Sequence, residues 1–447
     1  MRFTSHKQLG SLKALCMAGV LALGAQPTMA EPTIMEGFPP TAESQVTLKN
    51  YRDYPYNRWS FHNLGAIANT LMIPRAGAIQ SLTEANNPTL GQLQVTDGYG
   101  KQRSVDQILD SEDTDAFVVL QGDKLLMERY FNGMSRYDQH IWFSATKSLT
   151  TTALGILVEQ GKIDLNASPV NYIPELKGSG FERVTIQEVL DHSTAIDFKE
   201  NYTDLTSDFF QHYAPAMKMA FLPGAQDVQP GDTEIYGIYD FLARFIKPDT
   251  TLEPNQAFDY NSANADLAGW LISRVSGMPY HQFIQQHIWS KLGTEHDAYI
   301  AADRALMAIA TGGMNTTARD AARFGRMILN RGQVNGEQVI PANWVDTSLA
   351  ITDHDKAKMK ANTKYKDNSW IAYKNMWWII DENQGEYAAV GIHGQVIYIN
   401  RAANVVIAYF SSQPTASAAR NPQFQSKLFA AQAIARHLQS ASSASTK

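Results

Sequence analysis

Two neighbouring stretches decide the fold: DAFVVLQGDKLLMERYF at residues 115–131 and SATKSLTTTALGILVEQG at residues 144–161. In the first, two apolar segments flank Gly122-Asp123, a pattern typical of a β-hairpin with a tight turn. In the second, apolar side chains recur at helical spacing until a glycine ends the run. The sequence therefore predicts a β-hairpin followed closely by a helix, with Ser144 at the helix N-terminus.

The strand pattern returns near the end of the chain, after a region from about 162 to 300 in which the apolar spacing is mostly helical. A last helix is expected from about Gln423 to Leu438. Because strands come first and last, we predict an α/β chain of the α+β type. It has a central antiparallel sheet built from both chain ends, flanked by helices, with an inserted, mostly helical lobe. The late strand candidates are Met376–Ile380, Tyr387–Ile392, Val396–Asn400 and Val405–Ser411.

Composition suggests how the chain divides. A stretch rich in Pro, Asn, Gly and aromatic residues precedes the hairpin, and a Ser/Ala-rich stretch ends the chain. The predicted parts are a signal peptide at 1–30, an irregular extension at 31–110 packed on the body, a sheet domain at 111–160 plus 301–439, a helical lobe at 161–300 and a disordered tail at 440–447.

The first thirty residues are typical of an export signal. Three basic residues precede an apolar run at 14–25, and Thr28-Met29-Ala30 follows as a small-residue cleavage site. The run is too short to span a bilayer, although an uncleaved anchor or a buried helix is the alternative. We expect a periplasmic or secreted protein, cleaved after Ala30 and without a membrane span thereafter. Cys16 is the only cysteine, so the mature chain would have no disulfide and no thiolate chemistry.

The mature chain is acidic. Without residues 1–30 it has 35 Lys and Arg against 44 Asp and Glu, a net charge of −9, and no block of basic residues. Such a chain is a poor candidate for binding nucleic acid or an anionic membrane surface. We therefore expect a small molecule as its partner, and the sequence does not indicate an oligomeric state.

Ser144-Ala145-Thr146-Lys147 places a serine and a lysine three residues apart at the expected start of a helix. Backbone N–H groups at a helix N-terminus favour an oxyanion near Ser144. Side chains three residues apart share a helix face, so the Lys147 amine can reach the hydroxyl and, where burial lowers its pKa, accept a proton. The spacing alone is weak evidence, because a helix-capping Ser144 beside a solvated Lys147 explains it at least as well.

A second candidate segment runs from Phe258 to Asn264, after a Pro/Asn loop and at the start of another predicted helix. Tyr260 at such a position can relay protons, while Ser262 and Asn264 can hydrogen-bond a substrate amide. Taken alone, Tyr260 is more typical of a core phenol whose hydroxyl has found a partner.

The third candidate segment is His393-Gly394-Gln395, between two predicted strands. A glycine here lets a substrate lie close to the strand edge, and the backbone N–H of Gln395 can donate to a developing oxyanion. Taken alone, the tripeptide is more typical of a turn.

In this order, the three segments resemble the serine β-lactamase and penicillin-binding-protein superfamily, most closely its class C and carboxylesterase branch. The resemblance extends from about Asp115 to Leu438. Further segments are similar to the 6-aminohexanoate-dimer hydrolases, the nylon-oligomer-cleaving offshoot of that branch. These segments are Val189-Leu190-Asp191, Ala195-Ile196-Asp197-Phe198, Glu200-Asn201-Tyr202-Thr203-Asp204, Thr317-Ala318-Arg319-Asp320 and Gly391-Ile392-His393-Gly394-Gln395.

The resemblance implies a β-lactamase/transpeptidase-like fold and a serine hydrolase of the carboxylesterase or amidase type. Ser144 would be the nucleophile and Lys147 its base, and Tyr260 would pass a proton to the leaving group and later activate water. The backbone N–H groups of Ser144 and Gln395 would form the oxyanion hole. The resemblance also suggests substrate-binding roles for Tyr202, Ser262, Asn264, His393, Gly394 and Trp378.

The sequence departs from most β-lactamases where they have Lys-Thr-Gly or Lys-Ser-Gly and this chain has His393-Gly394-Gln395. A histidine is mostly neutral at pH 7, so the fixed cation for a β-lactam carboxylate is missing. We expect a small ester or linear amide as substrate, while D-amino-acid peptides and weak β-lactam hydrolysis remain open.

The alternatives to this hydrolase come from other classes. A non-catalytic cell-wall sensor on this fold should have lost Ser144, Lys147 or Tyr260, and the chain has all three. The sequence has neither a Gly-x-Ser-x-Gly elbow nor His-Glu-x-x-His, so we expect no metal and no cofactor.

Overall fold

A computed structural model describes residues 33–202, 204–219, 234–365, 370–416 and 421–445. Residues 33–45 belong to a small unit of their own, in which the Met35 N–H donates to the Ser44 carbonyl at 2.9 Å. The second unit begins at Val46 and contains every element named below. The predicted signal peptide at 1–30 lies outside the described residues.

An eight-stranded sheet is the centre of the second unit within the described residues. All its neighbours pair antiparallel except β2 and β6, which are parallel. The predicted central sheet built from both ends of the chain is therefore confirmed. In spatial order the strands are β14 (Ala372–Lys374), β15 (Trp377–Asp381), β16 (Glu386–Gly391), β17 (Gln395–Asn400), β18 (Val405–Ser411), β5 (Thr114–Gln121), β6 (Lys124–Tyr130) and β2 (Thr83–Glu84).

The pairing of β18 with β5 joins the two ends of the chain. Val405 lies opposite Gln121 and Tyr409 opposite Phe117 in this ladder. Nearly all residues of both strands are buried, because helices cover both faces of the sheet. This explains why the two strands are continuous apolar runs rather than alternating ones.

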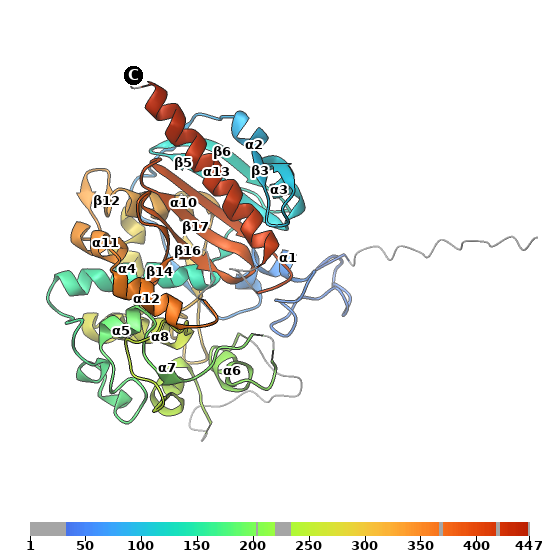
Figure 1. Ribbon diagram of the computed structural model, residues 1–447. Helices are drawn as coiled ribbons and strands as arrows, with labels where there is room; N and C mark the ends of the chain where they lie inside the picture. Colours follow the sequence, from blue (N-terminus) through green and yellow to red (C-terminus); the bar gives the residue numbers. More distant parts are fainter. Residues whose placement is uncertain (1–32, 203, 220–233, 366–369, 417–420, 446–447) are drawn as a thin grey trace, which may run out of the picture. The chain divides into compact units, whose positions relative to one another are not determined.

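Helices α10 (Ala318–Leu329) and α13 (Pro422–Ser445) cover opposite faces of this sheet. A Cβ on Gly325 of α10 would lie 2.6 Å from Val406 and 2.8 Å from Ile397, so this helix packs directly on β17 and β18. On the other face, Gln432 of α13 donates to Glu386 of β16 at 2.6 Å. Figure 1 shows α13 crossing the strands.

Helix α4 (Thr146–Glu159) lies between the sheet and the helical lobe and is almost entirely buried. It packs on α8 (Ser262–Ser276) and on α9 (Tyr280–His287), where the hydroxyls of Thr150 and Tyr280 are 2.7 Å apart. A second sheet ends on β7, just ahead of Ser144. In spatial order its strands are β1 (Thr70–Ile73), β10 (Ala298–Ala301), β11 (Met314–Thr316) and β7 (His140–Ile141). The start of α4 is thus supported from both sides.

The remaining helices of the described residues are short. The α-helices are α5 (Ile186–Leu190), α6 (Ala214–Ala216), α7 (Ile238–Asp240), α11 (Ala342–Leu349) and α12 (Asp353–Ala361). The other strands are β8 (Ile196–Asp197), β9 (Lys247–Pro248), β10 (Ala298–Ala301), β11 (Met314–Thr316), β12 (Gln333–Val334) and β13 (Glu337–Gln338).

The stretch from 46 to 110, predicted to be irregular, instead contains several short elements. Two of its strands join the two sheets: β1 pairs with β10, and β2 pairs with β6. These elements have two to seven residues each, too few to produce a readable periodicity. They are α1 (Asn57–Ser60), β1 (Thr70–Ile73), β2, α2 (Thr89–Gln92), β3 (Gln94–Thr96), β4 (Gln102–Ser104) and α3 (Val105–Ser111).

The predicted disordered tail at 440–447 is wrong for its first part, because α13 continues to Ser445. A buried stripe that includes Phe424, Ile434 and Leu438 anchors the helix on the body. The hydroxyl of Ser440 bonds back to the carbonyl of Arg436 at 3.0 Å, so a serine is accommodated in the last turns. Residues 446–447 lie outside the described residues.

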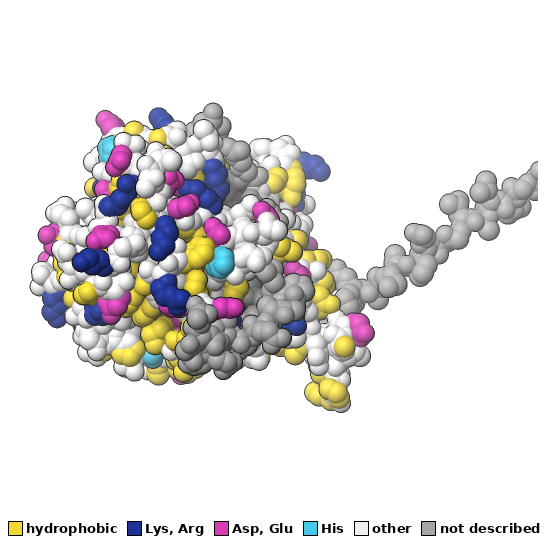
Figure 2. Space-filling model, turned by 90° about the horizontal axis from the view of Figure 1, so that it is seen from below, with side chains coloured by type: hydrophobic (Ala, Val, Ile, Leu, Met, Phe, Trp, Pro, Cys, Tyr) yellow, Lys and Arg dark blue, Asp and Glu magenta, His cyan; other side chains and the backbone are white. Residues whose placement is uncertain are grey.

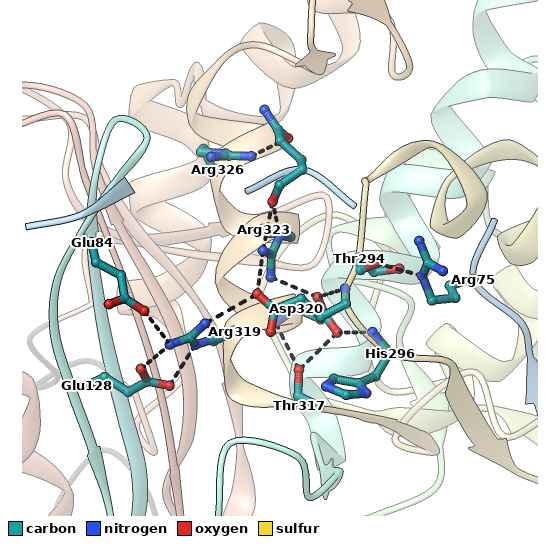
Figure 3. Close-up of polar contacts among 12 residues, drawn as sticks. Arg75, Glu84, Glu128, Thr294, His296, Thr317, Arg319, Asp320, Arg323 and Arg326 are labelled. Carbon is teal, nitrogen blue, oxygen red and sulfur yellow. Dashed lines mark hydrogen bonds and ion pairs between the residues drawn. The ribbon is translucent and has the colours of Figure 1, made fainter. Parts of the chain in front are cut away.

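Arginines of α10 tie this helix to its surroundings (Figure 3). Arg319 forms a bidentate ion pair with Glu128 of β6, with N–O distances of 2.5 and 2.8 Å. Arg323 binds Glu295 at 2.7 Å and Asp320 at 3.0 Å. Asp320 also accepts the backbone N–H groups of Glu295 and of the next residue. These buried charges are paired, so they hold the helix, the hairpin and the loop before β10 in one arrangement.

No helix in the described ranges is long and apolar enough to cross a membrane. On the face shown in Figure 2, Lys and Arg side chains are interspersed with Asp and Glu, so neither sign of charge dominates that face.

Candidate active site

Ser144 lies in a single 3-10 turn, Phe143–Ala145, which leads directly into α4. Phe143 has a φ of 44°, a conformation that costs energy for a bulky side chain and that the surrounding contacts must hold. One such contact is Trp142, whose N–H donates to Met314 O at 2.8 Å. The N-cap position of α4 is Ala145, and no side chain caps this helix. Ser144 therefore does not cap α4, which was the alternative interpretation of the sequence.

Lys147 is buried, with 1% of its surface exposed, and its amine points to Ser144. Its Nζ donates to Ser144 Oγ at 2.8 Å and to the carbonyl of Thr311 at 3.1 Å. Among the described residues no carboxylate lies within ion-pair distance of this amine. Burial lowers the pKa of Lys147 to about 8, against the charges of Glu200 and Asp266, which raise it. A substantial fraction of Lys147 can therefore be in the neutral amine form near pH 8.

Asp266 is a buried carboxylate on α8 behind the lysine. It accepts the Tyr213 hydroxyl at 2.5 Å and the Thr311 N–H at 2.9 Å. Burial raises the pKa of this carboxyl, and the three neighbours Tyr213, Thr311 and Lys147 oppose the increase. Since the Thr311 carbonyl also accepts from Lys147, the backbone of this one residue connects the carboxylate to the amine.

Tyr260 lies beside Lys147, whose Nζ is 4.9 Å from the centroid of the tyrosine ring. Burial raises the pKa of the Tyr260 phenol well above its usual range, and the charge of Glu200 adds to this. A hydrogen bond with Ser144 lowers it in part. The phenol therefore stays protonated at rest, as a proton donor requires.

His192 holds the backbone on both sides of Tyr260. Its carbonyl accepts the Asp259 N–H at 2.8 Å, and its Nδ1 accepts the Asn261 N–H at 3.0 Å. The His192 and Tyr260 ring centroids are 5.0 Å apart. Burial, with Lys147 nearby, lowers the pKa of this imidazole well below its usual value, so it remains neutral and able to accept. His192 thus positions the tyrosine.

A cavity of about 60 Å³ lies beside Ser144. Apolar side chains make much of its wall, and a short glycine turn at 312–313 forms another part. Its polar and charged lining includes Arg52, Glu200, Tyr202 and Ser262. A small organic group can therefore enter next to the serine hydroxyl.

Glu200 connects two polar groups at this cavity. Its Oε1 accepts the Tyr202 hydroxyl at 2.8 Å, and its Oε2 accepts the Ser262 N–H at 2.7 Å. The predicted substrate-binding residues Tyr202 and Ser262 do line the cavity. No role was predicted for Glu200, although it lies in one of the segments that carry the family resemblance.

Gln395, whose backbone N–H is the predicted second oxyanion donor, is not among the residues that line the cavity. Gln395 is fully buried, and its amide Nε2 donates to the Ser411 carbonyl at 2.7 Å. The residue of this turn that lines the cavity is Ile392. Next to it, a Cβ on Gly391 would lie 2.2 Å from the Trp142 carbonyl, so this end of β16 lies directly against the turn that carries Ser144.

His393 and Gly394 do not line the cavity either. The His393 Nδ1–H donates to the Gln413 carbonyl at 2.7 Å, and burial lowers the pKa of this imidazole to about 3. A Cβ on Gly394 would meet Ser411 and Gln413, so this glycine permits a close turn rather than a substrate contact. His393 is thus neutral, as the sequence predicts, but turned into the core.

Two other predicted substrate contacts lie next to the site without lining the cavity. Asn264 is fully buried and accepts the Thr194 hydroxyl at 3.2 Å. Trp378 stacks on Tyr260, with ring centroids 5.7 Å apart and an angle of 21°. Both residues support the tyrosine helix and ring in this structure.

Five residues of this site were not predicted from the sequence: Arg52, His192, Asp266, Thr311 and Ile392. Arg52 and Thr311 are far from Ser144 in sequence and stand in no recognisable motif. Asp266 had one available signal, because it is an acidic residue in an otherwise apolar helical run six positions after Tyr260.

The sequence matches the beta-lactamase family over residues 102–431. It is 32% identical over 378 residues to the 6-aminohexanoate-dimer hydrolase of Paenarthrobacter ureafaciens, covering 84% of this chain and 91% of that protein.

Solved structures agree with the sequence comparison. A Bacillus anthracis protein assigned as a 6-aminohexanoate-dimer hydrolase has a TM-score of 0.78 and 28% identity, covering 90% of this chain and 99% of that one. A family VIII carboxylesterase has a TM-score of 0.53 and 16% identity over 74% of this chain and 94% of its own, a likeness of fold alone.

Proposed function

Because the chain belongs to the beta-lactamase family of serine hydrolases, we propose that it cleaves a small ester or linear amide through an acyl-enzyme on Ser144. The observation that carries this proposal is the 2.8 Å contact between the buried Lys147 amine and the Ser144 hydroxyl. A buried lysine without a carboxylate partner among the described residues is costly to keep, which favours a chemical role over a structural one.

Acylation begins with proton transfer from Ser144 Oγ to neutral Lys147 Nζ. The oxygen then attacks the substrate carbonyl carbon, and a tetrahedral oxyanion forms. The ammonium produced on Lys147 is stabilised by the carbonyl of Thr311, which already accepts from it, and by the charges of Glu200 and Asp266.

The leaving group needs a proton when its bond to the carbonyl carbon breaks. Tyr260 is suited to supply it, because burial keeps its phenol protonated and its ring lies against Lys147. The Lys147 ammonium can return a proton to the phenolate. In deacylation the same groups take a proton from the attacking water, and Ser144 is regenerated with release of the acid.

The oxyanion hole would use backbone N–H groups. Ser144 supplies one from the 3-10 turn before α4. For the second we propose Ile392 in place of Gln395, because Ile392 lines the cavity and the neighbouring Gly391 packs against the serine turn.

The substrate class is narrowed by the relatives and by the cavity. The two 6-aminohexanoate-dimer hydrolases act, by their names, on a dimer joined by an amide bond, which favours a linear amide or a related ester here. The buried, neutral His393 supplies no cation at the position where most β-lactamases have a lysine. We therefore expect β-lactams to be poorer substrates than short linear esters.

We also propose that the protein is exported and begins at Glu31 after signal cleavage, on the strength of the basic and apolar segments that end at Ala30. N-terminal sequencing of periplasmic material that returned Met1 would reject this.

Intact mass spectrometry tests the acyl-enzyme. The mature protein is incubated with a fluorophosphonate, with p-nitrophenyl esters and with a β-lactam. We expect one fluorophosphonate adduct, which peptide mapping assigns to Ser144, together with turnover of the esters. A folded protein that remains unlabelled and hydrolyses no ester would contradict the proposal and would favour a binding protein on this fold.

A further inference from the structure

Arg52 contributes a positive charge to the cavity beside Ser144. It lies in the turn before α1, on a stretch that the sequence analysis assigned no function. Its guanidinium carbon is 6.0 Å from the centroid of the Phe209 ring, and its side chain hydrogen-bonds to the neighbouring Tyr51. Both Phe209 and Tyr51 line the same cavity, so these contacts hold the guanidinium at the cavity wall.

Arg52 has no ion-pair partner among the described residues. Within the described residues, no carboxylate lies within 4.0 Å of its guanidinium, in contrast to Arg58, which pairs with Asp113 at 3.0 Å. His393, whose pKa the charge of Arg52 helps to lower, stays neutral. A planar guanidinium matches the geometry of a carboxylate and can bind it with two parallel hydrogen bonds.

The one carboxylate of the cavity serves other groups. Glu200 accepts hydrogen bonds from Tyr202 and Ser262, and its charge acts on Lys147 and Tyr260. The carboxylate of Glu200 thus acts on the reacting groups Lys147 and Tyr260. The guanidinium of Arg52 lines the cavity and can meet a substrate there.

The rest of the wall is suited to a hydrocarbon chain. It contains apolar residues from four separate stretches of sequence, and methionines among them can adapt to a flexible chain. These residues are Phe143, Ala214, Met217, Met219, Ile309 and Ile392. An apolar wall with one arginine matches a short alkyl chain that carries an anionic end.

We propose that Arg52 binds a carboxylate of the substrate, so that this enzyme prefers linear esters or amides whose chain in the Ser144 cavity carries a carboxylate. The proposal rests on the acyl transfer proposed above and adds a specificity-determining residue to it. The carboxylate takes no part in the bond-breaking step. Its binding holds the substrate chain in place, so that chains with a neutral or cationic end bind more weakly.

Matched pairs of substrates test this preference. In one pair the carboxylate is on the acyl chain: p-nitrophenyl hexanoate against mono-p-nitrophenyl adipate. In the other it is on the leaving group: phenyl butyrate against 4-carboxyphenyl butyrate. We expect a kcat/KM at least about tenfold higher for the carboxylate in one of the two pairs, which also shows which part of the substrate reaches Arg52.

Substitution of Arg52 then assigns the effect. Arg52→Gln should raise KM for the preferred carboxylate substrate about tenfold, so that most of the difference in kcat/KM between the two members of that pair disappears. Arg52→Lys should retain part of the preference, because it keeps the charge and loses the fork. Lys49→Gln is the matched control: it removes one positive charge from the same segment, but its side chain is exposed and does not line the cavity.

A binding measurement separates this proposal from the chemistry at Ser144. Calorimetric titration of the full chain with adipate should show binding that Arg52→Gln weakens about tenfold and Lys49→Gln does not change. Equal kcat/KM within both pairs, or an Arg52→Gln protein with the wild-type preference and adipate affinity, would overturn the role of Arg52. Adipate binding lost in Arg52→Gln without any ester turnover would instead keep this site and reject the acyl-enzyme.

Discussion

Two clusters of buried charged residues, one around α10 and one around α4, differ in whether the cations have carboxylate partners. Around α10, Arg319 and Arg323 each face carboxylates at 2.5 to 3.0 Å, and the carboxylate of Asp320 is saturated with donors. Around α4, the buried amine of Lys147 faces a hydroxyl and a carbonyl, with the nearest charges held back. In the first cluster each arginine has a carboxylate partner, and in the second the lysine has none within ion-pair distance among the described residues.

The difference teaches what each cluster is for. A paired buried charge has a single favourable arrangement, so it fixes the position of a helix, but it has little tendency to give up or gain a proton. A buried amine without an ion-pair partner has a lowered pKa and can exchange its proton during a reaction. By this criterion the α10 cluster is structural and the α4 cluster is catalytic, and variants can test both assignments.

The largest effect is expected from Ser144→Ala. Hydrolysis of p-nitrophenyl butyrate should fall to background, at least about 10⁴-fold, because no other described group near Lys147 can take the place of the hydroxyl. The free energy of unfolding from urea titration should change by less than about 1 kcal/mol, since Ser144 does not cap α4.

Ser148→Ala is the matched control for that loss. Ser148 lies one turn further along the same helix, is buried, and donates to the Met376 carbonyl at 2.7 Å. Its loss should cost stability and leave turnover intact. An active Ser144→Ala protein would move the nucleophile elsewhere.

The next effect is the loss of the proton-transfer groups. Lys147→Ala and Tyr260→Phe should each slow acylation by a factor on the order of 10² to 10⁴, measured in a stopped-flow single turnover. Tyr280→Phe removes a similarly buried hydroxyl, which contacts Thr150 away from the cavity, and should leave the rate almost unchanged. Near-wild-type acylation by the Lys147→Ala protein would place that amine among the structural charges.

Breaking the paired cluster should affect stability instead of chemistry. Arg323→Met removes the cation that pairs with buried Asp320 and the nearer of the two arginines at Glu295, which keeps Arg319 at 3.4 Å. We expect this loss to cost about 3 to 5 kcal/mol in the free energy of unfolding. Arg331→Met breaks the exposed pair with Asp346 and should have a much smaller effect in the same urea titration. The folded Arg323→Met protein should keep its kcat; a large fall in kcat would end the distinction between the two clusters.

The smallest effect concerns the pH dependence. Because the reaction needs neutral Lys147, kcat/KM should rise with pH through about 8, where burial sets its pKa. The negative charge of Asp266 favours the ammonium form and so raises this pKa. In Asp266→Asn the rise should occur at lower pH, by up to about one unit.

The control for the pH profile is Asp303→Asn, which removes another buried carboxylate that binds the backbone N–H groups of Ile238 and Met307. Its profile should follow the wild type. If Asp266→Asn lowered the rate equally at every pH, Asp266 would be holding the Thr311 turn and not tuning the amine.

Local features of the sequence determined the framework of the fold. The hairpin of β5 and β6 and the helix α4 were predicted to within two residues at each end, and so were the four late strands β15 to β18. Side-chain periodicity and turn residues act over a few positions, so a short window contains the information. The three-residue spacing of Ser144 and Lys147 is of the same kind, because one helix turn brings them together.

Other features depended on partners far away in sequence. The short strands β1 and β2 exist because β10 and β6 offer them edges, which no window within 46–110 reveals. The lining of the oxyanion region depended on such partners too: the tight turn after β16 places Ile392 at the cavity, while the Gln395 side chain binds Ser411 of β18.

The sequence by itself therefore determined which chemistry is available, a serine with a lysine one turn on and a tyrosine in a later segment. Only the tertiary structure decided that this chemistry is poised. Burial lowers the pKa of Lys147. Packing from remote segments brings Tyr260 against Lys147, and brings Glu200 and Arg52 to the wall of the cavity beside Ser144. Desolvation and long-range charge depend on what surrounds a group in space, and that environment forms only when distant parts of the chain pack together.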